Sequence, residues 1–295
     1  MTALPDCKPV TTSMHGKICV ITGANTGIGK AAAEALAALG AQIVMICRNR
    51  AKGERALAEI AAAAAKSGRG GGAELSIADL SSQTEVRAVA SGILAAHPRI
   101  DVLVNNAGVA LKRRELTVDG IERTFAVNYL AYFMLANLLL PGLRAAGSGR
   151  IVNVSSNAHR RGKLDFDNLQ GERSYSNVRM YSESKLEDVM FTYALARRLA
   201  GSGVTANALH PGVVATEIWR QVPILDFLSG WLMLSPEKGA RTTVYLAASP
   251  DVEGVTGEYF DRCRPAGTIA LSHDVALQEK LWATSVALTG VGADI

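Results

Sequence analysis

The sequence lacks both a marked charge excess and a long hydrophobic run. Lys and Arg number 31 against 27 Asp and Glu, which gives a formal net charge of +4. So small an excess, without a basic run, does not predict nucleic-acid binding, although it suits an anionic cofactor. The longest apolar stretch, 129–140, contains Asn137 and stops at Pro141. It is too short to cross a membrane and predicts a buried helix instead.

Cysteines and targeting signals are also scarce. None of the four cysteines has a CxxC spacing, and two of them lie in apolar, strand-like runs, where cysteine behaves as a small hydrophobic residue. Neither a metal site nor a disulfide framework is therefore predicted. Residues 1–17 lack the apolar core of a secretory signal, so we expect a cytoplasmic chain. The cysteines are Cys7, Cys19, Cys47 and Cys263.

Short apolar runs alternate with longer helical segments along the 295 residues. Strands are predicted at 17–22, 42–47, 74–77, 101–104, 150–155, 204–209 and, last, 257–260. Helices are predicted at 27–39, 50–66, 81–96, 118–143, 181–201 and 236–248. Such βαβ units build a doubly wound parallel sheet between two helical layers. We expect one three-layer α/β domain, with an N-terminal arm at 1–15 and a C-terminal extension at 265–295.

A glycine-rich turn follows the first strand, with the sequence TGANTGIG at 22–29. Glycines let the backbone turn sharply and approach a pyrophosphate, whose charge then rests on the N–H groups of a helix N-terminus. The alternative is tight packing of a strand against a helix, but the position at the first βα junction favours dinucleotide binding. The candidate residues are Gly23, Asn25, Thr26, Gly27, Ile28 and Gly29.

The residue after the second strand bears on which dinucleotide is bound. Enzymes that bind NAD usually carry an acidic residue here for the ribose 2′-hydroxyl, whereas an arginine accommodates the 2′-phosphate of NADP. This chain has Arg48, and 42–52 contains no Asp or Glu. NADP(H) is therefore predicted over NAD(H). Arg50 is a weaker second candidate, and the alternative is that Arg48 is a solvated loop residue.

Two more strand ends carry candidate cofactor contacts. Asp79, followed by Leu80, comes just after the third strand and could accept a hydrogen bond from the adenine amine. Equally, Asp79 could begin the turn before the next helix. Small and amide residues follow the fourth strand, which suits a ligand crevice at the carboxyl edge of an open sheet. These residues are Asn105, Asn106, Ala107 and Gly108.

Tyr181 and Lys185 are four positions apart, so they share one face of a helix. A phenol has a pKa of about 10, too high for easy proton exchange at neutral pH. A nearby ammonium would favour the phenolate and lower that pKa. Ser155 or Ser156, where the fifth strand ends, could hold the reacting oxygen. The spacing alone often marks only a solvated helix face; its weight comes from the glycine turn and the serines.

Together, TGANTGIG, NNAG and YSESK make this sequence resemble the short-chain dehydrogenase/reductase family, from about residue 16 to 264. Within it, the chain looks like the retinol dehydrogenase-like branch, which also has an insert corresponding to 160–177. The resemblance implies a Rossmann-type fold in which Tyr181 exchanges the proton. It further implies that Lys185 lowers the tyrosine pKa and binds the nicotinamide ribose, that Ser156 polarises the substrate oxygen, and that Asn128 holds a proton-relay water.

The same resemblance implies further contacts to the cofactor. Asn105, Ala107 and Gly108 would pack against it, and a segment after the sixth strand would hold the nicotinamide carboxamide. That segment comprises Pro211, Gly212, Val214 and Thr216. His159 and His210 are expected to be structural. Homo-oligomerisation, as a dimer or tetramer, is likewise a family expectation.

The segment 217–235 is where the family places a substrate lid, and its sequence is strongly apolar. Trp219, Phe227 and Trp231 suit a lipophilic aldehyde, ketone or alcohol in a water-poor pocket. The alternative is an ordinary amphipathic helix or a subunit contact. We therefore expect an NADP(H)-dependent oxidoreductase acting on a lipophilic small molecule. The rivals are a catalytically silent NADP-binding sensor or scaffold and, last, an isomerase or dehydratase that retains NAD.

Overall fold

The computed structural model describes residues 7–213 and 234–295. Within them the strands are β1 (Ile18–Thr22), β2 (Gln42–Cys47), β3 (Gly72–Ile77), β4 (Val102–Asn105), β5 (Arg150–Val154), β6 (Thr205–His210), β7 (Tyr259–Asp261) and β8 (Arg264–Pro265). The α-helices are α1 (Gly27–Ala38), α2 (Arg50–Ser67), α3 (Gln83–Ala96), α4 (Arg123–Phe125), α5 (Ala131–Leu138), α6 (Leu140–Ala145), α7 (Asn177–Arg198), α8 (Pro236–Ala248) and α9 (Val275–Thr289). A π-helix, η1 (Ala126–Leu130), and the 3₁₀ helices η2 (Asn157–Arg161), η4 (Pro250–Val252) and η5 (Ala270–His273) complete the described elements.

The strands form one sheet in the order β3-β2-β1-β4-β5-β6-β7-β8. All neighbours pair in parallel except β8, which runs antiparallel to β7. The order reverses between β1 and β4, which are adjacent although two βα units separate them in sequence. At such a switch point the loops at the carboxyl ends of the strands diverge and leave a crevice where ligands bind. The predicted doubly wound sheet is confirmed.

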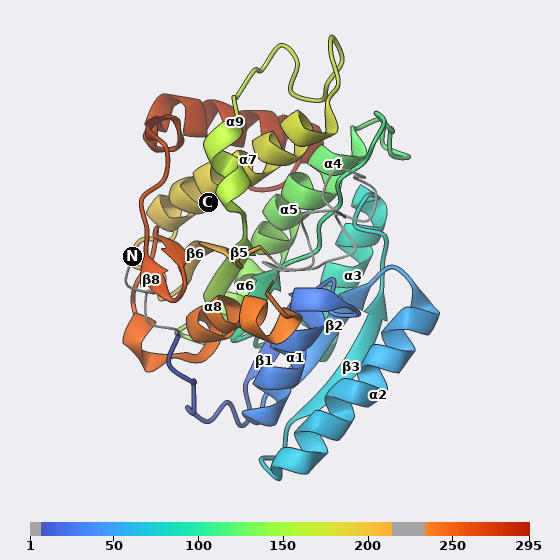
Figure 1. Cartoon of the computed structure of the whole chain (residues 1–295), viewed down its shortest axis with the longest axis vertical. Coiled ribbons are helices and arrows are strands. Elements are labelled where there is room, and N and C mark those ends of the chain that lie inside the picture. Colours follow the sequence, from blue (N-terminus) through green and yellow to red (C-terminus); the bar gives the residue numbers. More distant parts are fainter. Residues whose placement is uncertain (1–6, 214–233) are drawn as a thin grey trace.

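Alternation along the central strands assigns their side chains to two cores. On β1, Val20 belongs to one buried cluster, whereas Cys19 and Ile21 belong to the other. This follows from the two-residue period of a strand, which turns neighbouring side chains to opposite faces. One core is closed by α1, α2 and α8, and the other by α3, α5 and α7. The result is a sheet between two helical layers (Figure 1).

The predicted helix at 118–143 is wrong as a single element. The chain turns at Gly120, where φ is +72°, and the carboxylate of Glu122 accepts a hydrogen bond from the Phe125 amide at 2.8 Å. A side chain that caps in this way marks a helix start. After η1 and α5, Pro141 sits in the first turn of α6, where its missing N–H costs nothing. The Glu122 cap thus moves the helix start to Arg123 and Pro141 lies at the start of α6, whereas α4, η1 and α5 follow one another without a break.

The other predicted elements are found with shifted ends. The helix predicted from 81 begins at Gln83, because Ser82 accepts a hydrogen bond from the Glu85 amide as its N-cap. The helix predicted from 181 begins one turn earlier, at Asn177. That turn places Tyr181 inside a helix that is already formed, rather than at a fraying end. The helix predicted at 236–248 has those bounds in the structure.

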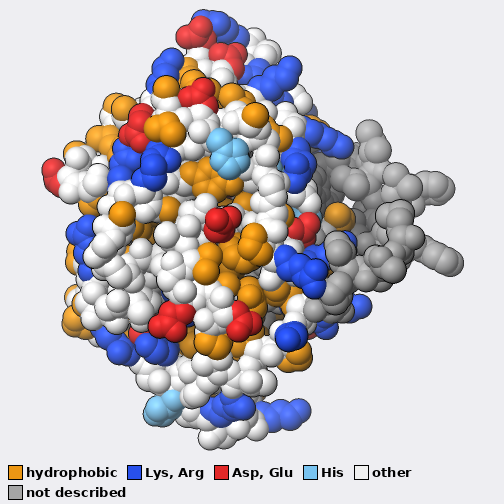
Figure 2. Space-filling model, turned by 90° about the vertical axis from the view of Figure 1, so that its left-hand side faces the viewer, with side chains coloured by type: hydrophobic (Ala, Val, Ile, Leu, Met, Phe, Trp, Pro, Cys, Tyr) orange, Lys and Arg blue, Asp and Glu red, His pale blue; other side chains and the backbone are white. Residues whose placement is uncertain are grey.

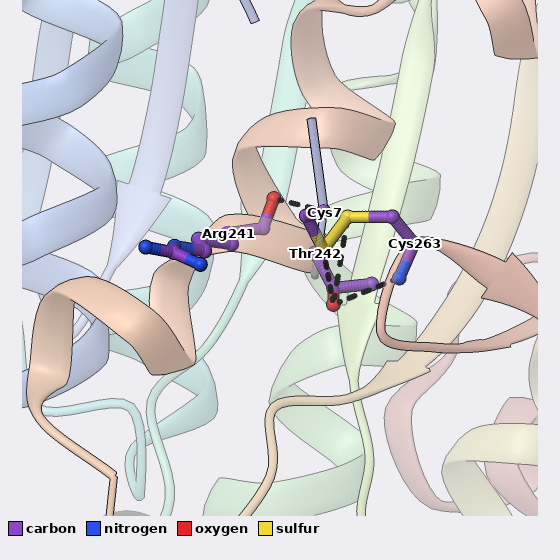
Figure 3. Close-up of a disulfide and its surroundings, with 4 residues drawn as sticks. All are labelled: Cys7, Arg241, Thr242 and Cys263. Carbon is purple, nitrogen blue, oxygen red and sulfur yellow. Dashed lines mark hydrogen bonds between the residues drawn. A yellow bond between two sulfur atoms is a disulfide. The ribbon is translucent and has the colours of Figure 1, made fainter. Parts of the chain in front are cut away.

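The prediction that no disulfide would form is wrong. Cys7, in the N-terminal arm, is bonded to Cys263, between β7 and β8 (Figure 3). The two residues are 256 positions apart in the sequence, so no local spacing could reveal the pair. Disulfides are rare in the reducing cytosol. The cross-link is therefore at odds with the expected cytoplasmic location, which stays a prediction. Cys19 and Cys47 are free and buried, as expected.

The C-terminal extension contains a helix that the sequence did not predict. α9 packs on α7, and its Leu281 and Trp282 belong to the same core as α3 and α5. The ring of Trp282 meets Phe133 at 4.9 Å between centroids and lies under the guanidinium of Arg198 at 3.9 Å. The Tyr129 and Ser285 hydroxyls are 2.6 Å apart. The extension is thus an integral part of the core.

No helix in the described ranges is long and apolar enough to cross a membrane. The face of the molecule drawn in Figure 2 mixes acidic and basic side chains with small hydrophobic patches. That face therefore presents no single-sign field of the kind that attracts nucleic acid.

Candidate active site

The glycine turn occupies the junction of β1 and α1, where its glycines pack closely against the loop after β4. Gly23 and Gly27 have φ of +66° and +57°, a conformation that glycine adopts without strain. At Gly29 an added Cβ would lie 2.3 Å from the Asn106 amide nitrogen and 2.5 Å from the Gly23 carbonyl oxygen. The Thr26 side chain makes no capping hydrogen bond to the described N-terminus of α1. The first N–H groups of α1 therefore suit a pyrophosphate, as the sequence predicts.

The loop after β4 is locked to this turn by Thr22. The Thr22 hydroxyl accepts hydrogen bonds from the backbone amides of Asn106 at 2.8 Å and Ala107 at 2.9 Å. In return, the Asn106 side-chain amide donates to the Thr22 carbonyl at 2.9 Å. The glycine turn and the loop after β4 are thereby held as one unit. Thr22 belongs to the first motif, but the sequence indicates no role for it.

Asn105 lies inside the sheet rather than at its rim. Its side chain is fully buried and donates to Asn153 at 2.9 Å, and Asn153 donates to Thr192 at the same distance. The Thr192 hydroxyl then donates to the Asp188 carbonyl at 2.7 Å. This series of hydrogen bonds between neutral groups links β4, β5 and α7, so it holds α7 against the ends of the strands.

Tyr181 is brought into contact with Ser156, as the sequence predicts. Burial raises the pKa of the Tyr181 phenol, and this effect exceeds the lowering by the Lys185 ammonium and by a hydrogen bond with Ser156. The predicted influence of the lysine is present, but it does not set the net direction. Asp188 acts in the same direction as burial. The site thus keeps this tyrosine protonated, ready to donate.

Lys185 is directed by two acceptors. Its ammonium donates to the Val154 carbonyl at 2.9 Å and to the Asp188 carboxylate at 2.8 Å. The nitrogen also lies 5.3 Å from the ring centroid of Tyr132 and 5.9 Å from that of Tyr181. An ammonium has three N–H donors. Two of them are used within the described part of the chain, which leaves one for a ligand such as a ribose hydroxyl.

Asn128 is buried in the π-helix η1. Its carbonyl oxygen accepts from the Val109 amide at 2.7 Å, and its nitrogen donates to the Val109 carbonyl at 2.9 Å and to the Ser184 hydroxyl at 3.0 Å. The side chain therefore clamps the loop after β4 to α7. Single turns of π-helix are frequent at functional sites. The predicted role in holding a relay water stays a prediction.

His159 supports Ser156 and His210 supports its neighbour Asn157, and the sequence predicts a structural role for both histidines. The ring of His159 is buried and donates from Nδ1 to the Ser156 carbonyl at 2.7 Å, and it packs against Tyr259 at 4.8 Å between centroids. Nδ1 of His210 accepts from the Asn157 amide at 3.3 Å. Burial lowers the pKa of both imidazoles, which favours their neutral forms. Both support the loop after β5 rather than exchange protons.

The remaining predicted contacts differ in how they are placed. Arg48 is exposed at the end of β2, in a position open to a ligand. The Asp79 carboxylate accepts from the Ser81 amide at 2.9 Å, which is the turn that the sequence left as the alternative. Leu80 is buried. Gly108 lies on the loop after β4, between Ala107 and the clamped Val109.

The nicotinamide segment is only partly described. Pro211 and Gly212 follow β6, and Gly212 has φ of +87°. The predicted contacts Val214 and Thr216 lie outside the described residues, as does nearly all of the predicted lid, 217–233. Among the residues that the structure describes, no group of His, Cys, Asp and Glu could hold a metal ion.

A doubly wound sheet with a glycine turn at its switch point and a Ser–Tyr–Lys group at the next strand end defines a nicotinamide-dependent oxidoreductase. Comparison with known proteins makes this more specific. The family model for short chain dehydrogenases matches residues 17–224. The chain belongs to this family, within its retinol dehydrogenase-like branch.

Several relatives are similar over almost their whole length. Retinol dehydrogenase 14 of Mus musculus is 42% identical over 291 residues, covering 94% of this chain and 87% of the relative. Retinol dehydrogenase 12 of Homo sapiens is 41% identical, with coverages of 94% and 88%. Among solved structures, an uncharacterized protein from Mycobacterium paratuberculosis is 33% identical with a TM-score of 0.79, covering 97% of each chain. An NAD(P)-dependent gluconate 5-dehydrogenase from Beutenbergia cavernae, with bound NADP, is 32% identical with a TM-score of 0.69, covering 85% of this chain and 96% of its own.

Proposed function

We propose that this protein uses NADP(H) to interconvert an aldehyde or ketone and an alcohol on a lipophilic small molecule. The observation that carries the proposal is the contact between Ser156 and Tyr181 beside the directed ammonium of Lys185. These groups are what a carbonyl oxygen needs when it gains a proton: a donor, a second hydrogen bond, and a positive charge nearby.

In the direction of reduction, the Tyr181 hydroxyl gives its proton to the carbonyl oxygen. The Ser156 hydroxyl donates a hydrogen bond to that same oxygen, and the resulting tyrosinate is stabilised by the Lys185 ammonium. A nicotinamide cofactor held by the glycine turn and Lys185 would supply the hydride for the carbonyl carbon. Oxidation of an alcohol reverses each step, with the Tyr181 oxygen as base. Because burial raises its pKa, Tyr181 carries its proton at the start of the reduction.

The choice of NADP(H) is supported by Arg48. It is exposed just after β2, and the stretch 42–52 has no acidic residue that would bind a ribose 2′-hydroxyl or repel a 2′-phosphate. The lipophilic substrate is supported by the apolar sequence of the lid and by the retinol dehydrogenases among the relatives. Retinal and medium-chain aldehydes are therefore the first substrates to test.

The test is consumption of NADPH and of NADH with straight-chain aldehydes, followed at 340 nm, and with all-trans-retinal, followed by chromatography. We expect turnover that is faster with NADPH and that improves with the apolar length of the aldehyde. Tight NADPH binding without turnover across the panel would instead identify the NADP-binding sensor or scaffold. A preference for NADH would overturn the role of Arg48.

A further inference from the structure

The buried part of α7 holds more charge than the Tyr181–Lys185 pair requires. Asp188 is completely buried one turn beyond Lys185, and its Oδ2 accepts a hydrogen bond from the Lys185 ammonium at 2.8 Å. Its other oxygen, Oδ1, has no hydrogen-bond partner within the described residues. A buried carboxylate with an unpaired oxygen costs stability. Such a cost is tolerated at functional sites more readily than elsewhere.

We propose that Asp188 is a positioning residue, whose carboxylate keeps the Lys185 ammonium charged and directed toward Tyr181. The inference rests on the proposed function, because it concerns the same proton transfer. The ammonium is nearly fully buried, with 4% of its side chain exposed. Burial without a counter-charge favours the neutral amine, which can no longer stabilise a tyrosinate.

The geometry gives Asp188 two separate effects. Together with the Val154 carbonyl, it fixes the direction of the Lys185 side chain from the side of the helix. It also supplies the negative charge that offsets the burial of the ammonium. Burial raises the pKa of Asp188 to about 7, while Lys185 acts to lower it. The ion pair is therefore complete at neutral to alkaline pH, where a tyrosine base operates.

The surroundings of Asp188 offer no substitute for its charge. The ionisable groups that face it within the described chain come from α7, η1 and α5, and they are Lys185, Tyr181, Glu187, Tyr129 and Tyr132. Burial raises the pKa of Glu187, Tyr129 and Tyr132 well above their usual values. These three groups are thus held in their neutral forms.

The kinetic test is the pH profile of alcohol oxidation, measured as kcat from pH 6 to 10 in Asp188→Asn and in Glu187→Gln. The asparagine keeps the shape and one acceptor oxygen, removes the charge, and replaces the other oxygen with an NH2 group. We expect Asp188→Asn to show a new alkaline limb, in which kcat falls about tenfold per pH unit as one proton is lost. Glu187, at the same depth and without a hydrogen-bond partner in the described chain, is the matched control. Its profile should follow the parent.

Superimposable profiles for Asp188→Asn and Glu187→Gln would overturn the proposal. So would a uniform loss of kcat at every pH, since a merely structural residue would act that way. Restoration of the parent profile by Asp188→Glu at reduced kcat would support a role for the charge.

A second measurement does not depend on turnover, so it separates this inference from the proposed function. In Asp188→Asn the folded state would release the Lys185 proton, whereas an unfolded lysine keeps its proton to about pH 10.4. The unfolded state then binds more protons, so stability rises with pH. The Tm deficit of Asp188→Asn against the parent should shrink between about pH 8 and 10. The double variant Lys185→Met with Asp188→Asn should show no such change. A deficit that stays constant in the single variant would overturn the inference even in an active enzyme.

Discussion

Two sides of the site are built from different groups. Around β1 and β4 the contacts are backbone amides, glycines and neutral side chains such as Thr22 and Asn106. Around α7 they are buried ionisable groups, with Tyr181, Lys185 and Asp188 each about one turn from the next. The first, which we call the neutral side, has few titratable groups. The second, the ionisable side, depends on the protonation state of its groups.

This difference separates binding from chemistry. A pyrophosphate needs a close approach of the backbone, so the neutral side is specified by volume and by φ. A proton donor needs a tuned pKa, so the ionisable side is specified by burial and charge. Changes on the neutral side should therefore alter cofactor affinity without moving the pH profile. Changes at Tyr181 and Asp188 on the ionisable side should alter kcat, with affinity nearly intact.

The largest expected effect is on the ionisable side, in Tyr181→Phe. Removing the proton donor should lower kcat by about 10²–10⁴-fold, the usual contribution of general acid–base catalysis. The ring keeps its packing, so the Kd for NADPH, measured by fluorescence titration, should change little. A variant with unchanged kcat would break the comparison, because the chemistry would then lie elsewhere.

On the neutral side, Gly29→Ala should weaken NADPH binding and lower stability by about 1–3 kcal/mol, as overpacking does. The added Cβ would meet Asn106 at 2.3 Å and Gly23 at 2.5 Å. Gly92→Ala is the matched control, because nothing lies within 4 Å of a Cβ there. It sits in α3, where alanine is the better helix former. Calorimetry gives both the NADPH affinity and the stability of each variant. A shifted pH profile in Gly29→Ala would count against the separation of binding from chemistry.

Arg48→Ala tests the one point where the neutral side is predicted to use a charge. NADPH affinity should fall about tenfold, the lower end of what a hydrogen bond to a charged group contributes, because the side chain is exposed. NADH affinity should be unchanged. Arg50→Ala tests the weaker candidate: Arg50 lies on the same exposed turn but pairs with Glu54 at 3.7 Å, so its loss should cost less NADPH affinity. Equal losses for the two cofactors would refute the assignment of Arg48.

The neutral side was the more predictable from sequence. Glycine spacing and strand ends are local signals, and they place Gly23, Gly27 and the NNAG loop where the structure has them. On the ionisable side, local reasoning predicts only residues whose spacing puts them on one helix face, as with Tyr181 and Lys185. Asp188 could have been found by the same reasoning, since i,i+3 neighbours also meet on a helix. No comparable pattern in the sequence indicates that His159 supports Ser156.

The remaining misses are long-range. The disulfide joins residues at opposite ends of the chain, and α9 is stabilised by its contacts with α7 rather than by a strong amphipathic pattern of its own. Local propensity cannot report on partners that only the folded chain brings together. The prediction of one helix over 118–143 failed for another reason, because the cap at Glu122 moves the helix start to Arg123, past residues that the predicted helix included.

The smallest effect on catalysis is expected for the disulfide, which lies outside both sides of the site. Figure 3 shows Cys263 beside α8, where its amide donates to the Thr242 hydroxyl at 3.3 Å. Closing a loop of 256 residues restricts the unfolded chain, so removing it should cost about 2–5 kcal/mol. Adding a reductant should therefore lower Tm by several degrees. The kcat below that Tm should stay unchanged.

Cys7→Ser separates this effect from any other action of the reductant. The variant should already have the lower Tm, and reductant should not lower it further. A loss of kcat on reduction at a temperature where the fold persists would show that the arm communicates with the ionisable side. Such a result would contradict the view that charge around α7, rather than the attachment of the termini, sets the rate.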